Sequence, residues 1–165
     1  MADVAGTIIN GLGKAWEIVK DGKPVSSAKG IFCQAMPENH AFTEFAGWKT
    51  TSKMHTISQY NQAGTEVVFA ILKFDFMWGG QIKGVPGMWL TNFNAWCSNS
   101  EVKNQWKLNI DATVAGPPFN AAGGGAPPIG GITLEVSWEI GTFMDSGTEA
   151  MKITATGDGK FTRHH

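Results

Sequence analysis

The stretch ITLEVSWEIGTFMDSGTEAMKITAT, residues 132–156, carries the clearest structural pattern in the chain. Apolar side chains occupy every second position in both of its halves: Leu134, Val136, Trp138 and Ile140 in the first, and Met151, Ile153 and Ala155 in the second. A period of two places such side chains on one face of a β-strand. Between the halves lie Asp145, Ser146 and Gly147, which favour turns because Asp and Ser bond local backbone and Gly tolerates positive φ. The stretch therefore predicts a β-hairpin.

The string Asp-Ser-Gly-Thr that begins at Asp145 is also the local signature of an aspartic protease. Those enzymes need two aspartates that share a proton, because two carboxyl groups at close range push their pKa values apart. This chain has one copy of the string, and it joins two amphipathic strands. We therefore interpret Asp145 as a turn residue. The sequence also lacks a G-x-S-x-G elbow, a P-loop and a dinucleotide fingerprint, so we expect neither enzymatic activity nor a cofactor.

Composition extends the β prediction to the rest of the chain. The 165 residues include 21 glycines and 7 prolines, which punctuate short segments in the manner of sandwiches and barrels. Strand-like patterns recur in residues 28–36, 40–48, 53–60, 65–78, 88–97 and 104–114. A chain of this length fits one domain with its own hydrophobic core. We expect a mainly β, single-domain β-sandwich.

Charge and histidine placement exclude two classes of partner. The net charge is -1, the lysines are scattered, and Arg163 is the one arginine in the sequence. Such a chain offers little electrostatic attraction to nucleic acid. Neither His40 nor His55 has a carboxylate at metal-ligand spacing within a predicted helix, so we predict no metal site.

The chain carries no pattern of a signal peptide, and its longest apolar run, residues 67–72, is far below the ~20 residues of a transmembrane helix. We expect a secreted or released soluble protein, with a cytoplasmic one as the alternative. Cys33 and Cys97 are too far apart for a CxxC motif, and both two buried thiols and one disulfide remain open.

The N-terminal segment differs from the rest of the chain. Val4, Ile8, Leu12 and Trp16 follow one another at four-residue spacing, with Ile9 alongside, which is typical of the apolar stripe of a helix. Three glycines within the segment each cost roughly 1 kcal/mol relative to Ala, so such a helix depends on a surface to lie against. We predict an amphipathic helical segment at residues 1–22, followed by the β-sandwich at 23–165.

Two further features suggest binding. Trp78 and Met88 lie beside Gly-rich turns, where we expect large apolar side chains to be exposed, and an amphipathic Trp suits a membrane interface or a sugar. Residues 115–131 form a long segment rich in Gly, Pro and Ala, which is either functional or flexible.

Three segments, in this order, resemble the actinoporins, the pore-forming cytolysins of sea anemones. Residues 2–20 resemble their N-terminus in the Ala-Gly-Thr-Ile-Ile and Gly positions. Residues 67–78 are similar to the strand that ends in the family's Phe-Asp-Tyr-x-Trp aromatic loop. Residues 141–155 resemble its terminal hairpin in the Met, Ser, Glu-Ala and Met-x-Ile positions.

The resemblance implies a β-sandwich flanked by helices that binds sphingomyelin-containing membranes and forms an oligomeric pore with its N-terminal helix. We predict that membrane or ligand binding involves Phe74, Phe76, Trp78, Met88, Trp89 and Tyr60, and that membrane insertion involves Val4, Ile8, Ile9, Leu12 and Trp16. The family's phosphocholine pocket uses several tyrosines, whereas this chain has Tyr60 alone.

These observations leave three hypotheses for function. The first is a membrane-binding, pore-forming protein that assembles as a homo-oligomer on lipid. The second is a non-enzymatic, lectin-like module that binds glycans, because fungal fruit-body lectins have a fold related to that of actinoporins. The third is a self-assembling structural protein that uses the N-terminal segment and residues 115–131 for subunit contacts.

Overall fold

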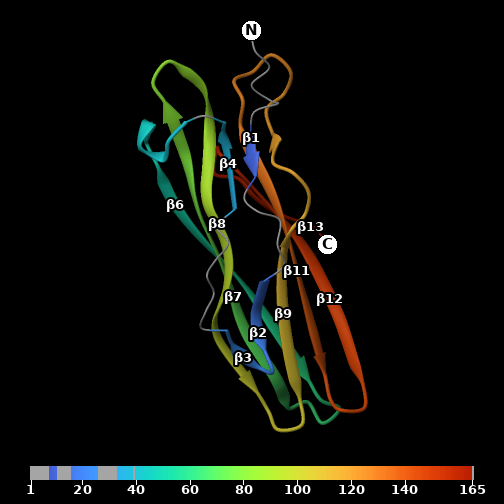
Figure 1. The fold of residues 1–165 in the computed structure, drawn as a ribbon. Coiled ribbons are helices and arrows are strands. Elements are labelled where there is room, and N and C mark those ends of the chain that lie inside the picture. The colour runs from blue at the N-terminus through green and yellow to red at the C-terminus, as the bar shows by residue number, and fades with distance from the viewer. Residues whose placement is uncertain (1–7, 11–15, 26–32, 39, 165) are drawn as a thin grey trace.

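The computed structural model describes residues 8–10, 16–25, 33–38 and 40–164. Two antiparallel β-sheets pack face to face in this structure, as Figure 1 shows, so the chain is mainly β. Helix is restricted, within the described residues, to the short 3-10 segment η2 (Phe42–Glu44). No helix of the described part is long and apolar enough to span a bilayer.

The first sheet has the order β1-β4-β8-β7-β5, and β6 also pairs with β7. Its strands are β1 (Ile8–Asn10), β4 (Cys33–Pro37), β5 (Phe45–Ala46), β6 (Lys49–Tyr60), β7 (Glu66–Ile82) and β8 (Val85–Val102). Strand β6 pairs along its whole length with β7. Because β7 lies between β6 and β8, strand β6 forms an edge of this sheet.

The second sheet has the order β13-β12-β11-β9-β2-β3, and β10 also pairs with β11. Its strands are β2 (Trp16–Lys20), β3 (Lys23–Pro24), β9 (Lys107–Val114), β10 (Phe119–Asn120), β11 (Gly130–Gly141), β12 (Ser146–Thr156) and β13 (Phe161–His164). Strand β13 pairs with β12 only from Lys152 to Ala155. The first half of β12 therefore has no partner on its outer side among the described strands.

The core lies between the sheets and follows the alternation in the sequence. The largest fully buried side chains come from both sheets: Trp89, Phe74, Phe76, Phe93, Leu72, Leu90, Leu108, Ile110, Ile132, Leu134, Ile153 and Val19. Burying one such side chain contributes about 1.5–3 kcal/mol relative to leaving it in water. The sandwich is thus held together mainly by the side chains on the inward face of each long strand.

The predicted terminal hairpin is confirmed. Strands β11 and β12 pair without interruption from Gly131–Thr156 to Gly141–Ser146. The turn itself spans residues 142–145, slightly earlier than predicted, because Ser146 and Gly147 already belong to β12. The Thr142 amide donates to the Asp145 carbonyl at 2.7 Å and closes the turn.

The prediction of an N-terminal helix is wrong for the described part of that segment. Residues 8–10 form β1 and residues 16–20 form β2, which pairs with β9. Ile18 and Val19 of β2 are buried in the core, so these two apolar side chains belong to a sheet and not to the apolar stripe of a helix. Two adjacent β-branched residues suit a strand, and the glycines weaken a helix. The predicted positions Val4 and Leu12 lie outside the described residues.

Residues 40–48 were predicted as one strand but contain η2 and the two-residue strand β5. Glu44 explains the difference. Its side chain accepts a hydrogen bond from the Ala41 amide at 2.6 Å, and its own amide donates to the Ala41 carbonyl at 2.9 Å. These local bonds favour a helical turn over an extended chain.

Cys33 and Cys97 are both buried thiols, which answers the question that their spacing left open. Residues 115–129 are held by Asn120, whose side-chain oxygen accepts from the amides of Ala122 and Ile129 at 2.9 and 3.0 Å. A bridge between Met88 and Ile129 joins this segment to β8.

Candidate functional site

The predicted aromatic loop is not a loop in the structure. Residues 74–78 lie inside strand β7, which continues to Ile82. Phe74 and Phe76 point into the core, and Trp89 of β8 is buried as well. These three residues, predicted to bind lipid, have almost no surface to offer a ligand here. The loop prediction failed because Gly79 and Gly80 continue the strand, and Gly80 leaves room for the Trp48 ring, with which a Cβ would collide.

Trp78 and Met88 are each half-buried, contrary to the expected exposure. The Trp78 indole nitrogen donates to the Thr51 hydroxyl at 2.9 Å, and the Lys49 ammonium lies 4.7 Å from the ring centroid. Met88 lines a small hollow of about 320 Å³ with the prolines at 127 and 128. Both side chains therefore lie against other parts of the fold and are only partly exposed to solvent.

Tyr60 is exposed and is the last residue of β6. That strand ends where three turns of the sandwich come together (Figure 1). These turns comprise residues 61–65, 103–106 and 142–145, which connect β6 to β7, β8 to β9 and β11 to β12. We call this region the turn end. Of the residues predicted to bind lipid, Tyr60 alone combines exposure with a position at this end.

The turn end presents two large apolar side chains to solvent. Phe143 is 95% exposed and Met144 is 96% exposed, both at the apex of the β11–β12 hairpin. The apex is a defined structure, since the Met144 amide donates to the Thr142 hydroxyl at 3.3 Å in addition to the bond that closes the turn. A tight turn normally carries polar residues at such positions. An exposed apolar pair is informative because large apolar patches mark interaction sites.

A groove opens beside this apex, between the edge of β6 and the first half of β12. Strand β6 pairs on one side with β7, and β13 covers β12 only from Lys152 onward. The two sheet edges consequently remain apart at this end. Farther along β6, Arg163 donates to the Met54 carbonyl at 2.6 Å and connects the two sheets. We call the opening the edge groove.

The edge groove consists of two adjoining hollows of about 460 and 450 Å³. The two hollows are continuous because they share four lining residues: Gln59, Trp138, Ile140 and Glu149. The first hollow reaches Trp106 and Asp145 near the apex, and the second follows β6 as far as His55. The His55 and Trp138 rings lie 5.5 Å apart within the second hollow.

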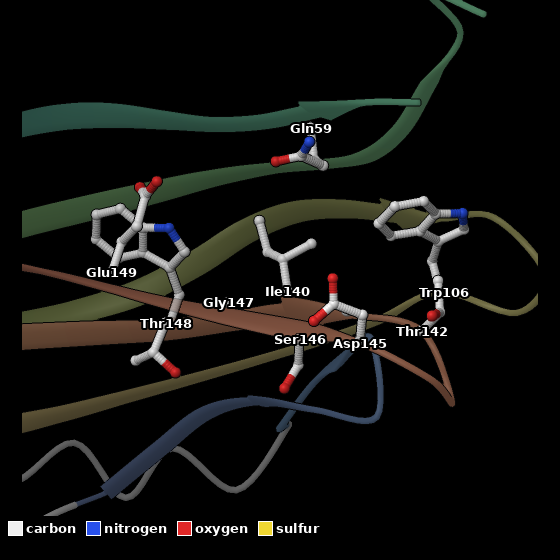
Figure 2. A pocket seen from close by; sticks show the side chains of 11 residues that line it. Gln59, Trp106, Ile140, Thr142, Asp145, Ser146, Gly147, Thr148 and Glu149 are labelled. Carbon is white, nitrogen blue, oxygen red and sulfur yellow. The ribbon is translucent and has the colours of Figure 1, made fainter. Parts of the chain in front are cut away.

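Figure 2 shows how the polar groups of the first hollow are directed. The carboxylates of Asp145 and Glu149 rise from the hairpin toward the strand that carries Gln59, and Ile140 lies between them. The Trp106 ring stands at one end. The hydroxyl groups of Ser146 and Thr148 point to the other side of the hairpin, so the amide and the two carboxylates dominate this face.

The groove carries acidic side chains. Among the described residues, its lining includes Asp145 and Glu149 but neither a lysine nor an arginine. No side-chain hydrogen bond or ion pair occupies either carboxylate among the described residues. By contrast, Glu139 on the opposite face of the hairpin accepts a 2.6 Å hydrogen bond from Lys107, which lowers the pKa of Glu139. The groove carboxylates are thus available to a ligand.

Sequence reasoning missed the apex and the groove. A signal for the apex was present, since Phe143 and Met144 are apolar residues in a turn between two amphipathic strands. The groove had no local signal, because Gln59, Trp106 and Glu149 belong to three different elements or turns. Comparison with protein-family models, curated proteins and solved structures finds no match to this chain.

Proposed function

We propose that this protein binds lipid membranes through its turn end, with Phe143 and Met144 entering the boundary between headgroups and acyl chains. The observation that carries the proposal is their nearly complete exposure, at 95% and 96%, on a closed turn. Tyr60 is exposed and Trp106 half-buried at the same end. Such amphipathic rings favour the interface between water and lipid.

The expected energy is sufficient for reversible binding. Burying a large apolar side chain contributes about 1.5–3 kcal/mol, so Phe143 and Met144 together supply about 3–6 kcal/mol. Since each 1.4 kcal/mol corresponds to a tenfold change in affinity, the pair accounts for about two to four powers of ten in partitioning. The turn loses little conformational freedom on binding, because it is already closed by one backbone hydrogen bond and by the bond from the Met144 amide to the Thr142 hydroxyl.

Charge at the turn end provides no net attraction to anionic lipid. The three turns contain one lysine, Lys103, and one aspartate, Asp145, so their formal net charge is zero. Attraction to anionic headgroups needs several basic residues near the surface. We therefore expect binding that depends little on ionic strength and that does not require anionic lipid.

Pore formation by the N-terminal segment, which the resemblance to actinoporins implies, would be a second stage. Strand β2 would have to separate from β9, and Ile18 and Val19 would have to leave the core. We propose that membrane binding by the turn end precedes this release. A disulfide between the cross-strand partners in an E17C/D111C variant should then block leakage but not binding, because such partners lie within disulfide range.

The primary test is sedimentation of the purified full-length chain with phosphatidylcholine vesicles, together with release of an encapsulated dye. The double variant F143S/M144S should lower the partition coefficient at least about 100-fold. The matched control is M54S, since Met54 is also an exposed methionine, at 59%, but lies in the middle of β6. M54S should bind like the native chain.

Thermal unfolding of each variant accompanies the binding assay, so that loss of binding is not confused with loss of fold. Equal binding by F143S/M144S and the native chain would contradict the proposal. So would a native chain that fails to sediment with vesicles of any of several compositions.

A further inference from the structure

The edge groove lies directly beside the apex that we propose enters the membrane, so its opening would sit at the level of the lipid headgroups. Asp145 connects the two features, since it ends the turn and also lines the groove. A ligand in the groove would therefore meet Gln59, Trp106, Asp145 and Glu149 while Phe143 and Met144 contact the acyl boundary. The chemistry of those four residues limits what that ligand can be.

Negatively charged ligands fit the groove poorly. A phosphate, sulfate or carboxylate group would face Asp145 and Glu149, and the part of the lining that the structure describes has neither lysine nor arginine to compensate. Like charges at close range cost several kcal/mol across a desolvated contact. Zwitterionic phosphocholine meets the same difficulty at its phosphate, and its quaternary ammonium group favours several aromatic faces. Trp138 is almost fully buried, so Trp106 is the more accessible indole of the groove.

A neutral sugar satisfies the same groups. Hydroxyl groups donate to carboxylate oxygens, and the Gln59 amide can both donate and accept. Hydrogen bonds to charged acceptors are the strong ones, and a carboxylate can accept from two neighbouring hydroxyls. The apolar C–H face of a pyranose ring can lie against a single indole, so one accessible ring such as Trp106 is sufficient.

The length of the groove indicates more than one sugar unit. The two hollows, of about 460 and 450 Å³, are continuous through Gln59 and Glu149 and open along β6. Pockets that bury small ligands generally measure about 300–1,000 Å³ in total. An open channel of this kind suits a chain that enters from the side, in contrast to an enclosed pocket for one small molecule.

We infer that the edge groove binds a neutral oligosaccharide, with Asp145, Glu149 and Gln59 as hydrogen-bonding groups and Trp106 as the stacking surface. The inference that this sugar is a glycolipid headgroup rests on the proposed function, whereas binding of the free sugar does not. Together the two contacts would select glycolipid membranes: the apex supplies apolar burial and the groove supplies recognition of the headgroup.

The first experiment applies the labelled full-length chain to a glycan array that holds neutral, sialylated and sulfated oligosaccharides. We expect binding confined to neutral glycans. The strongest neutral glycan is then titrated as the free oligosaccharide, with tryptophan fluorescence as the readout. It is also tested as the matching glycolipid in phosphatidylcholine vesicles. Free phosphocholine is titrated in parallel.

Three variants identify the site. E149Q and Q59A change exposed side chains and should each weaken glycan binding at least about tenfold while the fold remains intact. W106F keeps an aromatic ring in this half-buried position and should alter the fluorescence response. The matched control is E101Q, because Glu101 is an exposed carboxylate on β8 that does not line the groove. E101Q should bind glycan like the native chain.

The outcomes separate the two proposals. Both proposals hold if two results are obtained. F143S/M144S should bind the free oligosaccharide normally but fail to bind glycolipid vesicles. E149Q should bind plain phosphatidylcholine vesicles normally but bind the free oligosaccharide weakly. The glycan inference is overturned if the array shows no neutral glycan bound, or if sialylated or sulfated glycans bind equally well. It is also overturned if E149Q and Q59A bind the glycan normally. A change of tryptophan fluorescence with phosphocholine in place of the glycan would overturn it as well. None of these results would affect sedimentation with plain phosphatidylcholine, which tests the apex alone.

Discussion

Two regions of this molecule that contain aromatic residues differ in their exposure to solvent. Phe74 and Phe76 lie in the middle of β7 and are buried, whereas Phe143 lies at the apex of the β11–β12 hairpin beside Met144 and is almost fully exposed. The first region resembles a membrane-binding loop by sequence. In the second, the sequence predicted a turn at Asp145, Ser146 and Gly147, and the apex at Phe143 and Met144 was missed.

The difference between these regions arises from the position of each residue in its element. In β7, alternate side chains face the opposing sheet, so an aromatic residue there contributes to the core. At 142–145 the chain reverses direction outside the sandwich, and none of the described strands covers the side chains of Phe143 and Met144. An apolar residue therefore signals binding only where the fold cannot bury it.

The largest expected contrast is in stability. Phe74→Ala should lower the free energy of unfolding by about 3–5 kcal/mol, because it leaves a cavity among fully buried neighbours. Phe143→Ala should change it by no more than about 0.5 kcal/mol. Chemical denaturation monitored by tryptophan fluorescence measures both. Similar losses for the two variants would mean that the apex packs against the fold.

Glycines extend the contrast between core and surface to the backbone. A Cβ at Gly157 would collide with the backbone of Met88 and Trp89, whereas a Cβ at Gly123 meets no atom within 4 Å. Gly157→Ala should therefore cost about 1–3 kcal/mol through overpacking. Gly123→Ala serves as the control and should be neutral or slightly stabilising. A stable Gly157→Ala protein would show that β8 and residue 157 are less closely packed than the structure indicates.

The cysteines test the burial of the first sheet without any substitution. Burial raises the pKa of Cys33 to about 11 and also raises the pKa of Cys97. Both thiols should resist a thiol-specific reagent at pH 8 in the native chain and react once it unfolds. Because their folded pKa values are raised, this contribution to stability is present below the ordinary thiol pKa. It is lost as the pH rises toward about 11. Rapid labelling of two thiols in the native protein would contradict the burial.

The smallest effect concerns Glu139, on the side of the hairpin away from the groove. Hydrogen bonds from Lys107, Ser146 and Asn109 lower its pKa. A carboxyl with a lowered folded pKa stabilises the protein above its ordinary pKa, and the contribution disappears as the pH falls through the lowered value. E139Q should flatten the acid limb of a melting-temperature profile. An unchanged profile would show that Glu139 does not titrate differently on unfolding.

Much of the sandwich was accessible from local patterns. The hairpin of β11 and β12 was predicted from residues 132–156, and the inward faces of β8 and β9 also follow their alternation. The N-terminal segment was misassigned because apolar residues there fit both a helical stripe and a strand. Ile18 and Val19 became part of a sheet because β9 offers an edge with which they can pair.

The sequence by itself determined where strands form and which of their faces are apolar, because a period of two is a local property of the chain. The tertiary structure decided what each face and edge would meet. It covered Phe74 with the opposing sheet, left the side chains of Phe143 and Met144 exposed, and kept the edges of β6 and β12 apart. Those outcomes depend on pairings between residues far apart in sequence, so no local pattern could specify the groove that these edges enclose.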